Sequence, residues 1–226
     1  MTNPAVKVVL IRAAGEHFCA GADLKENAKV PSDAAWREYL AQFRSCYELI
    51  DQLPVPVVAA VQGFCVAGGL ELILSCDFAV AASTARLGDL HVRRNLLPGG
   101  GATWLLPGAV GLRNAAFLMM TGCLVTAEQA LHMGLVQMVV PPETLTEECR
   151  ALTAYIASRE DAVLQRAKRL TRDAGQRDRA AGYDAEADAS VAHFTSGIPT
   201  ASSRDFATTR DRLPQGGNLV PWRVSP

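Results

Sequence analysis

The sequence predicts an α/β fold in which short buried strands alternate with helices, followed by a helical region. Three observations support this prediction. Short, continuous apolar runs bounded by turn residues are typical of strands that are buried on both faces. Stretches with apolar residues three or four positions apart lie between these runs and predict amphipathic helices. The last part of the chain is more polar and helical in pattern, which predicts a helical region after an α/β core with parallel strand pairing.

The first predicted elements lie before a glycine-rich centre. Val6–Ile11 and Val57–Val61 are rich in β-branched residues and are predicted to be buried strands. Between them, Phe18–Leu24 contains glycine and is predicted to be a loop. Asp33–Leu53 has helical periodicity, with Asp33 as the expected N-cap, and two prolines end it.

The rest of the chain follows the same patterns. A helix begins at the central glycines, and the next predicted strands are Phe78–Ala82, Arg86–Gly88 and Leu135–Val140. The helices expected among them are Ala102–Leu106, Asn114–Met120 and Thr126–Met133. Later helices are expected at Glu143–Ser158, Asp161–Ala174, Ala180–Phe194 and Ser202–Arg212, before an irregular end at Gln215–Pro226. We therefore expect an α/β core over residues 1–140 and a helical region over residues 141–226.

Composition limits the classes of function. The chain has 226 residues and a net charge of −1, with a pI of about 6.4, so no excess of positive charge favours nucleic acid or an anionic membrane. No apolar run reaches the ~18 residues of a membrane-spanning helix, and no secretory signal pattern begins the chain. The six cysteines show neither metal-ligand spacing nor the pattern of a small disulfide scaffold. We expect a cytoplasmic protein with no metal site.

The centre of the chain is the helix start Ala67-Gly68-Gly69-Leu70-Glu71. Glycine allows a sharp turn and the close approach of a ligand. The first N–H groups of a helix lack internal partners and carry partial positive charge, so they can receive an oxygen that becomes anionic in a transition state. Glu71 lies three residues after Gly68, and both can face one cavity. A carboxylate at this position either compensates the helix dipole or takes part in chemistry.

Three stretches, in this order and spacing, resemble the crotonase superfamily, the enoyl-CoA hydratase/isomerase family. They are FCAGADL at 18–24, AGGLELILSCD at 67–77 and LLPGGGATWLLPGAVG at 96–111. The resemblance runs from about Val6 to Val140, with a weaker echo in the C-terminal helices. It implies a crotonase-like spiral of repeated ββα units, and a C-terminal helical region that takes part in forming a homotrimer or a hexamer of two trimers. It also implies a strand and a helix before Val6, and their absence here predicts either a misassigned start or a shortened variant.

The resemblance implies roles for particular residues. The N–H groups of Ala20 and Gly68 would form an oxyanion hole for the thioester carbonyl of an acyl-CoA substrate as it becomes enolate-like. Glu71 matches the first catalytic glutamate of the hydratases, which orients water and accepts its proton. No cofactor is implied beyond the coenzyme A of the substrate itself.

The resemblance also implies where the substrate would lie. The backbone around Ala22, Asp23 and Leu24 would hold the adenine end of coenzyme A, with Lys25 near the nucleotide. The acyl group would occupy an apolar pocket, and its expected lining residues are Leu90, Leu97 and Trp104.

One segment departs from the hydratases, which carry a second catalytic glutamate in a GxPE context. Here the segment is Gly88-Asp89-Leu90-His91-Val92, so His91 falls on the glutamate's place and Asp89 lies two residues before it. Histidine can act as an acid or a base near pH 7, and hydration is the leading expectation with Glu71, His91 and Asp89 as catalytic residues. A structural, hydrogen-bonded His91 is the alternative. Isomerisation, hydrolysis of a thioester or of a C–C bond, and acyl-CoA binding without catalysis also fit the pattern.

Overall fold

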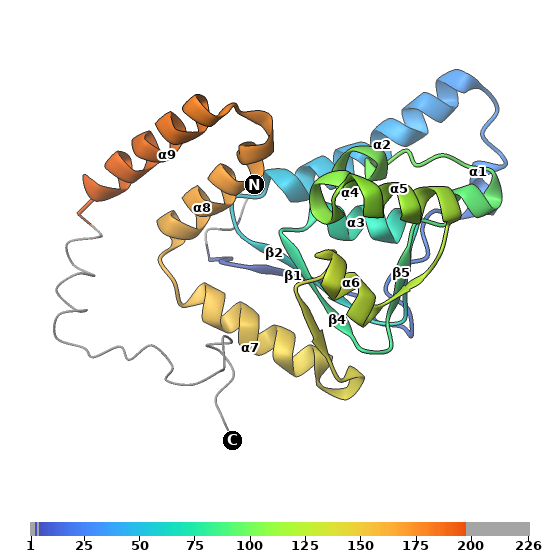
Figure 1. Cartoon of the computed structure of the whole chain (residues 1–226), viewed down its shortest axis with the longest axis horizontal. Coiled ribbons are helices and arrows are strands. Elements are labelled where there is room, and N and C mark those ends of the chain that lie inside the picture. Colours follow the sequence, from blue (N-terminus) through green and yellow to red (C-terminus); the bar gives the residue numbers. More distant parts are fainter. Residues whose placement is uncertain (1–2, 4, 198–226) are drawn as a thin grey trace. The chain divides into compact units, whose positions relative to one another are not determined.

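The computed structural model describes residue 3 and residues 5–197. The chain divides into two compact units, Met1–Thr153 and Ala154–Pro226. The first unit contains two β-sheets with helices, and the described part of the second is helical (Figure 1). The predicted helix Ser202–Arg212 and the irregular segment Gln215–Pro226 lie outside the described residues. The expected role of residues 141–226 in oligomerisation stays a prediction.

Four parallel strands form the first sheet, in the order β1-β2-β4-β7. Their bounds are β1 Val9–Arg12, β2 Val57–Val61, β4 Phe78–Ala82 and β7 Met138–Val140. Every residue of β2 is buried, as its continuous apolar run predicts for an inner strand that is covered on both faces. Asp77 fixes the start of β2, because its Oδ2 accepts the backbone N–H of Val57 at 2.7 Å.

Three shorter strands form the second sheet, in the order β3-β5-β6. They are β3 Phe64–Val66, β5 Arg86–Gly88 and β6 Val125–Thr126. β3 and β5 run parallel, whereas β5 and β6 run antiparallel. The pairs β2–β3 and β4–β5 each place one strand in each sheet before the next helix, so the chain repeats a ββα unit. The α/β fold expected from the sequence is confirmed.

Helices α2, α3, α4 and α5 lie side by side in the first unit (Figure 1). The helices of this unit are α1 Leu24–Asn27, α2 Asp33–Gln52, α3 Gly68–Ser75, α4 Ala102–Val110, α5 Leu112–Thr121 and α6 Ala127–Met133. Short 3-10 helices occur at η1 His91–Arg94 and η2 Pro142–Thr144. Leu70 of α3 and Leu106 of α4 are fully buried in the hydrophobic core, so the two helices that border the site are firmly packed.

The second unit contains α8 (Asp161–Asp173), η3 (Ala174–Gln176) and α9 (Arg179–Phe194). Helix α7 (Leu145–Ala157) leads into it from the first unit. Arg166 of α8 and Nδ1 of His193 in α9 are 2.9 Å apart and hydrogen-bond the two helices.

The structure corrects three element boundaries. The N-cap of α2 is Ser32 rather than Asp33, because the Ser32 hydroxyl accepts the N–H of Ala35 at 3.3 Å. Strand β1 begins at Val9 instead of Val6, where its pairing with β2 starts. Strand β7 begins at Met138 instead of Leu135, because the N–H of Leu135 still bonds to the end of α6.

Four short features were missing from the sequence prediction. The strands β3 and β6 are too short to show a periodicity of two. Within the predicted loop Phe18–Leu24, Cys19 pairs with Cys65 as a parallel bridge, and α1 begins at Leu24.

Candidate active site

The two glycine-containing stretches meet in the first unit. Cys19 pairs with Cys65, and the N–H of Val66 donates to the carbonyl of Cys19 at 3.0 Å. Gly21 then takes a φ of +93°, and a Cβ on it would lie 3.0 Å from the nitrogen of Gly68. A side chain at position 21 would be both strained and crowded, so this glycine brings the loop against the start of α3.

Helix α3 begins with a strained turn at Ala67, which has φ 52° and ψ −120°. Few residues other than glycine adopt a positive φ, and the bond from the Ala67 N–H to the Gly88 carbonyl, at 3.2 Å, helps to hold it. Within the described residues, the N–H groups of Ala20 and Gly68 have no hydrogen-bond acceptor. Both donors are available to a ligand oxygen, which supports the oxyanion hole; that role stays a prediction.

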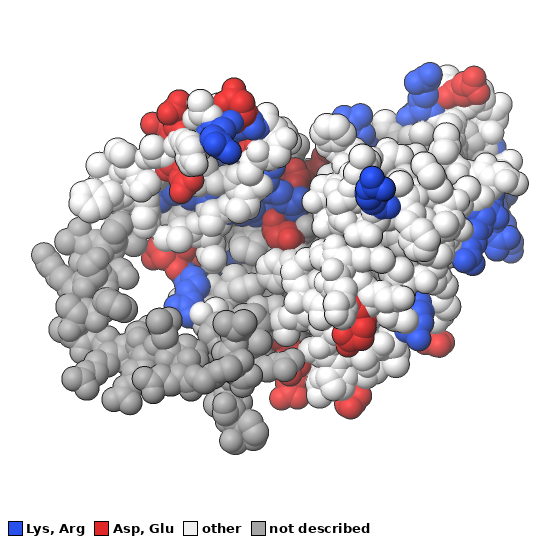
Figure 2. All heavy atoms as spheres, viewed as in Figure 1, with Lys and Arg blue, Asp and Glu red and all other residues white. Residues whose placement is uncertain are grey.

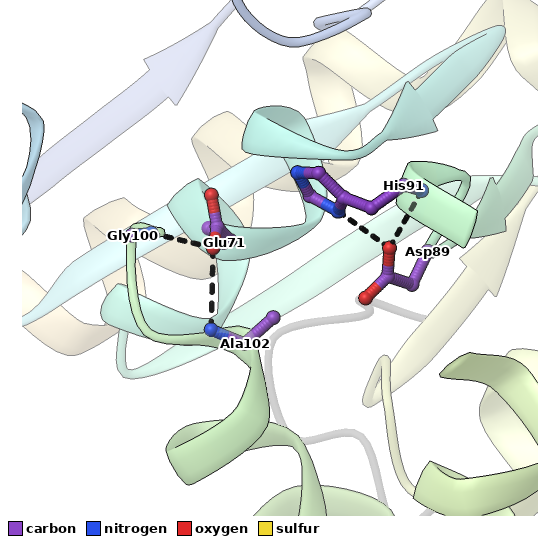
Figure 3. A network of polar contacts seen from close by, with 5 residues as sticks. All are labelled: Glu71, Asp89, His91, Gly100 and Ala102. Carbon is purple, nitrogen blue, oxygen red and sulfur yellow. Dashed lines mark hydrogen bonds and ion pairs between the residues drawn. The ribbon is translucent and has the colours of Figure 1, made fainter. Parts of the chain in front are cut away.

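Glu71 is buried in the first turn of α3, with 4% of its surface exposed. Its Oε1 accepts the backbone N–H groups of Gly100 at 2.8 Å and Ala102 at 3.3 Å (Figure 3). Ala102 is the first residue of α4, so the carboxylate also lies at the positively polarised start of that helix. The side chain is fixed by two backbone donors, as a base aimed at one substrate atom requires.

Asp89 and His91 form a second polar pair beside this carboxylate (Figure 3). Asp89, at 1% exposure, follows β5, and His91 begins η1. Oδ1 of Asp89 accepts the backbone N–H of His91 at 3.0 Å and contacts Nδ1 of its ring at 2.5 Å. We assign a proton to Nδ1, which leaves Nε2 for proton exchange. Oδ2 of Asp89 is buried and has no hydrogen-bond partner among the described residues.

The pKa of His91 is set by opposing effects. Burial lowers it, whereas the hydrogen bond and charge of Asp89 and the charge of Glu71 raise it. The net result is a pKa above the ordinary 6.5 of histidine. His91 therefore keeps a larger protonated fraction near neutral pH and can donate a proton there.

The residues expected to hold coenzyme A lie around the start of α1. Ala22 is half-buried, and its nitrogen lies 3.7 Å from the place of a Cβ on Gly68. Asp23, Leu24 and Lys25 are exposed, and Asp23 caps α1 by accepting the N–H of Lys25 at 2.8 Å. The structure therefore brings Ala22 beside Gly68 and leaves the other three accessible; their contact with coenzyme A stays a prediction.

The three residues expected to line the acyl pocket differ from one another in burial. Leu90 is half-buried and lies between Asp89 and His91 in the sequence. Leu97 and Trp104 are 87% and 77% exposed in the single chain. The structure thus keeps Leu90 with the site and puts Leu97 and Trp104 at the surface; contact with an acyl group stays a prediction for all three.

Three groups at the site were missed from the sequence. Gly100 and Ala102 supply the N–H donors to Glu71, and the run of three glycines before a helix start was the available signal. The Tyr47 hydroxyl donates to the carbonyl of Gly68 at 3.0 Å. Tyr47 lies on the apolar stripe of its helix, so the sequence pattern alone indicates a packing role.

The family model described as enoyl-CoA hydratase/isomerase matches residues 1–211. The chain belongs to the enoyl-CoA hydratase/isomerase family. It is 36% identical over 185 residues to an enoyl-CoA isomerase/hydratase of Mycosarcoma maydis, covering 81% of this chain and 67% of that protein. It is also 36% identical over 188 residues to the crotonyl-CoA hydratase of Syntrophomonas wolfei, covering 83% of this chain and 72% of that one.

Solved structures of enoyl-CoA hydratase/isomerase family members share this fold. An enoyl-CoA hydratase from Bacillus anthracis superposes with a TM-score of 0.87 at 34% identity, covering 95% of this chain and 83% of that one. A Thermobifida fusca protein solved in complex with CoA superposes with a TM-score of 0.80 at 27% identity, covering 86% and 79%. These structures confirm the crotonase-like fold expected from the sequence.

Two further observations concern metal binding and membrane-spanning helices. Across residues 3 and 5–197, no group of three or more His, Cys, Asp or Glu side chains is arranged to hold a metal ion. In the same part of the chain, no helix has the length and hydropathy needed to cross a bilayer. The expected cytoplasmic location stays a prediction.

Proposed function

We propose that this enzyme is an enoyl-CoA hydratase, which adds water across the double bond of a 2-enoyl-CoA. The observation that carries the proposal is the buried Glu71 carboxylate, fixed by two backbone N–H groups within one helical turn of the free N–H of Gly68. The crotonyl-CoA hydratase of Syntrophomonas wolfei, at 36% identity, is named for a reaction of this kind. Capping of its own helix does not explain this arrangement, because Glu71 bonds to N–H groups at the start of α4 rather than of α3.

The thioester would bind with its carbonyl oxygen between the N–H groups of Ala20 and Gly68. When water attacks C3 of the enoyl group, the electron pair of the double bond moves toward the thioester oxygen. That oxygen becomes enolate-like, and preorganised donors stabilise it more than they stabilise the neutral carbonyl. The removal of one such donor costs ~2.7–4 kcal/mol of transition-state stabilisation in known enzymes.

Glu71 would act as the general base in the first step. Its carboxylate accepts a proton from water while the hydroxyl group forms a bond to C3. Because Gly100 and Ala102 fix Oε1, the carboxylate meets the water without having to be reoriented. General bases of this kind contribute roughly 100- to 10,000-fold to rate.

His91 would complete the reaction as the general acid. Before the transfer, Asp89 stabilises the protonated imidazolium through its hydrogen bond to Nδ1. The proton on Nε2 then passes to C2 as the enolate collapses to the thioester. The proton held by Glu71 then returns to His91 through solvent, which restores both groups. This assignment gives His91 the place of the second glutamate of the hydratases.

We further propose that the enzyme works as a homotrimer or a hexamer of two trimers. Large apolar side chains are exposed on α4 and α5, and Figure 2 shows this surface as largely uncharged. The exposed residues are Trp104, Leu112, Phe117 and Met120. Apolar patches of this kind favour burial against a protein partner, and α9 adds exposed Tyr183, Val191 and Phe194 to the helical region expected to take part.

The test is incubation with 2-enoyl-, 3-oxo- and saturated acyl-CoAs, with mass detection of the products. Hydration adds the mass of one water to the 2-enoyl substrate only. Release of free coenzyme A would instead establish a hydrolase, and a product of unchanged mass that separates from the substrate by chromatography would establish an isomerase. Calorimetry with an acyl-CoA and its free acid completes the test: binding to neither would overturn the proposal, and binding without turnover would leave an acyl-CoA-binding protein.

A further inference from the structure

Tyr47 links helix α2 to the catalytic helix α3. It is half-buried, and its hydroxyl donates a hydrogen bond to the carbonyl oxygen of Gly68 at 3.0 Å. The carbonyl and the N–H of Gly68 belong to the two peptide groups on either side of one Cα. Gly68 is the first residue of α3, so a bond that holds its carbonyl also helps to hold the helix start from which its N–H points.

The ring of Tyr47 also touches the loop that holds Glu71. A Cβ on Gly100 would lie 2.4 Å from Cε2 of Tyr47 and 2.6 Å from Oε2 of Glu71. The ring edge, the Gly100 backbone and the carboxylate are therefore packed together. Tyr47 thus contacts both the carbonyl of Gly68, three residues before Glu71, and the Gly100 loop that orients the Glu71 carboxylate.

The hydroxyl of Tyr47 stays protonated at working pH. Burial raises the pKa of Tyr47 above its usual value, and the nearby charge of Glu71 raises it further. The neutral hydroxyl therefore keeps the proton that it donates to Gly68. Its bond to Gly68 is therefore independent of pH over the range in which His91 titrates.

We infer that Tyr47 is a positioning residue that sets the direction of the Gly68 N–H and the place of Glu71 for the developing enolate. The inference rests on the proposed function and adds Tyr47 as a residue that acts through Gly68 and Glu71. No contact between Tyr47 and the substrate is needed. The gain arises in the transition state, because a misdirected donor still binds a neutral carbonyl but stabilises an enolate less.

The experiment compares Tyr47→Phe with Tyr39→Phe. Phenylalanine keeps the ring against Gly100 and removes only the hydroxyl. Tyr39 lies two turns earlier on α2 in the same aromatic stripe, next to Phe43 at 5.0 Å between ring centroids, and its hydroxyl has no hydrogen bond within residues 3 and 5–197. Steady-state kinetics, thermal melting and the ultraviolet absorbance of the enolate of bound acetoacetyl-CoA are measured for both variants and for the wild type.

We expect Tyr47→Phe to lower kcat about 5- to 10-fold, as the loss of one hydrogen bond worth ~1 kcal/mol predicts, with KM within about twofold. The enolate fraction of bound acetoacetyl-CoA should fall in parallel, whereas Tyr39→Phe should match the wild type in both measurements. An unchanged enolate fraction in Tyr47→Phe overturns the inference, whether or not the melting temperature falls. A wild-type enzyme that forms the enolate without hydrating any enoyl-CoA overturns the hydratase proposal alone, because the enolate comparison still decides the role of Tyr47.

Discussion

The backbone N–H of Gly100 donates a hydrogen bond to the buried carboxylate of Glu71 at 2.8 Å (Figure 3). The two residues are far apart in sequence, and the contact exists because α4 starts beside α3. Gly100 is fully enclosed at this point, so its backbone approaches the carboxylate only because it carries no side chain.

Gly100→Ala should disable the enzyme. The new Cβ would lie within 2.6 Å of both Tyr47 and Glu71, so the loop or the carboxylate must move. We expect a fall in kcat of roughly 100-fold, in the range for a misplaced catalytic group, and a loss of about 1–3 kcal/mol in the free energy of unfolding from overpacking. The control is Gly108→Ala in α4, where no atom beyond the adjacent residues and the helix's own backbone lies within 4 Å of the new Cβ. Full activity in Gly100→Ala would show that the carboxylate does not need this geometry.

Glu71→Gln should lower turnover by about 100-fold or more, in the range for loss of a general base. The glutamine amide keeps the shape of the side chain, and its oxygen can still accept from Gly100 and Ala102. Acyl-CoA affinity, measured by calorimetry, should therefore change little. If the variant keeps full activity on the true substrate, Glu71 is a helix-start carboxylate and the base must be sought elsewhere.

The pH–rate profile should report His91. As a general acid, His91 is active when protonated, so the rate should fall as pH rises through its pKa, which lies above 6.5. Asp89→Asn removes the charge that raises this pKa, and the falling limb should move to lower pH. His91→Ala should reduce turnover and flatten this limb. A profile unchanged in His91→Ala, with only a lower melting temperature, would identify a structural histidine.

Protonation of His91 should also appear in stability. Since its pKa is higher in the folded chain than the 6.5 expected of the unfolded one, the charged pair with Asp89 stabilises the fold fully below that value. This contribution is lost as pH rises through the folded pKa. Urea unfolding at several pH values should show the loss in the wild type. His91→Ala should not show it, and an identical pH dependence in both proteins would contradict the assignment.

The oligomeric state should depend on the exposed face of α5. Met120→Lys places a charge on a side chain that is 78% exposed in the single chain, and burying this charge in an interface is unfavourable. We expect light scattering to show a trimer or hexamer for the wild type and smaller species for this variant. Leu49→Lys, at a 64% exposed position on α2, serves as the control. A wild-type monomer at micromolar concentration would contradict the proposed assembly.

The sequence predicted those parts of the fold that depend on local pattern. The buried run Val57–Val61 and the helix after Ser32 follow from apolar periodicity alone. The spacing of Gly68 and Glu71 predicted their common location because one helix carries both. The partners of Glu71 could not be predicted in this way, since Gly100 reaches it only through the packing of α4 on α3. Sequence pattern likewise fails to show that Trp104, part of an apolar run, lies at the surface of the chain.

The donors that hold Glu71, from Gly100 and Ala102, and those proposed to bind the thioester, from Ala20 and Gly68, are all main-chain N–H groups. A main-chain N–H is kept in every amino-acid substitution except one to proline. The proposed acid at position 91 is a side chain, so a single substitution removes it. Mutation during divergence can therefore exchange the proton donor while the enolate-stabilising frame persists. Proteins that keep these main-chain donors can acquire new reactions through single substitutions of the surrounding side chains, without first losing the ability to activate a thioester.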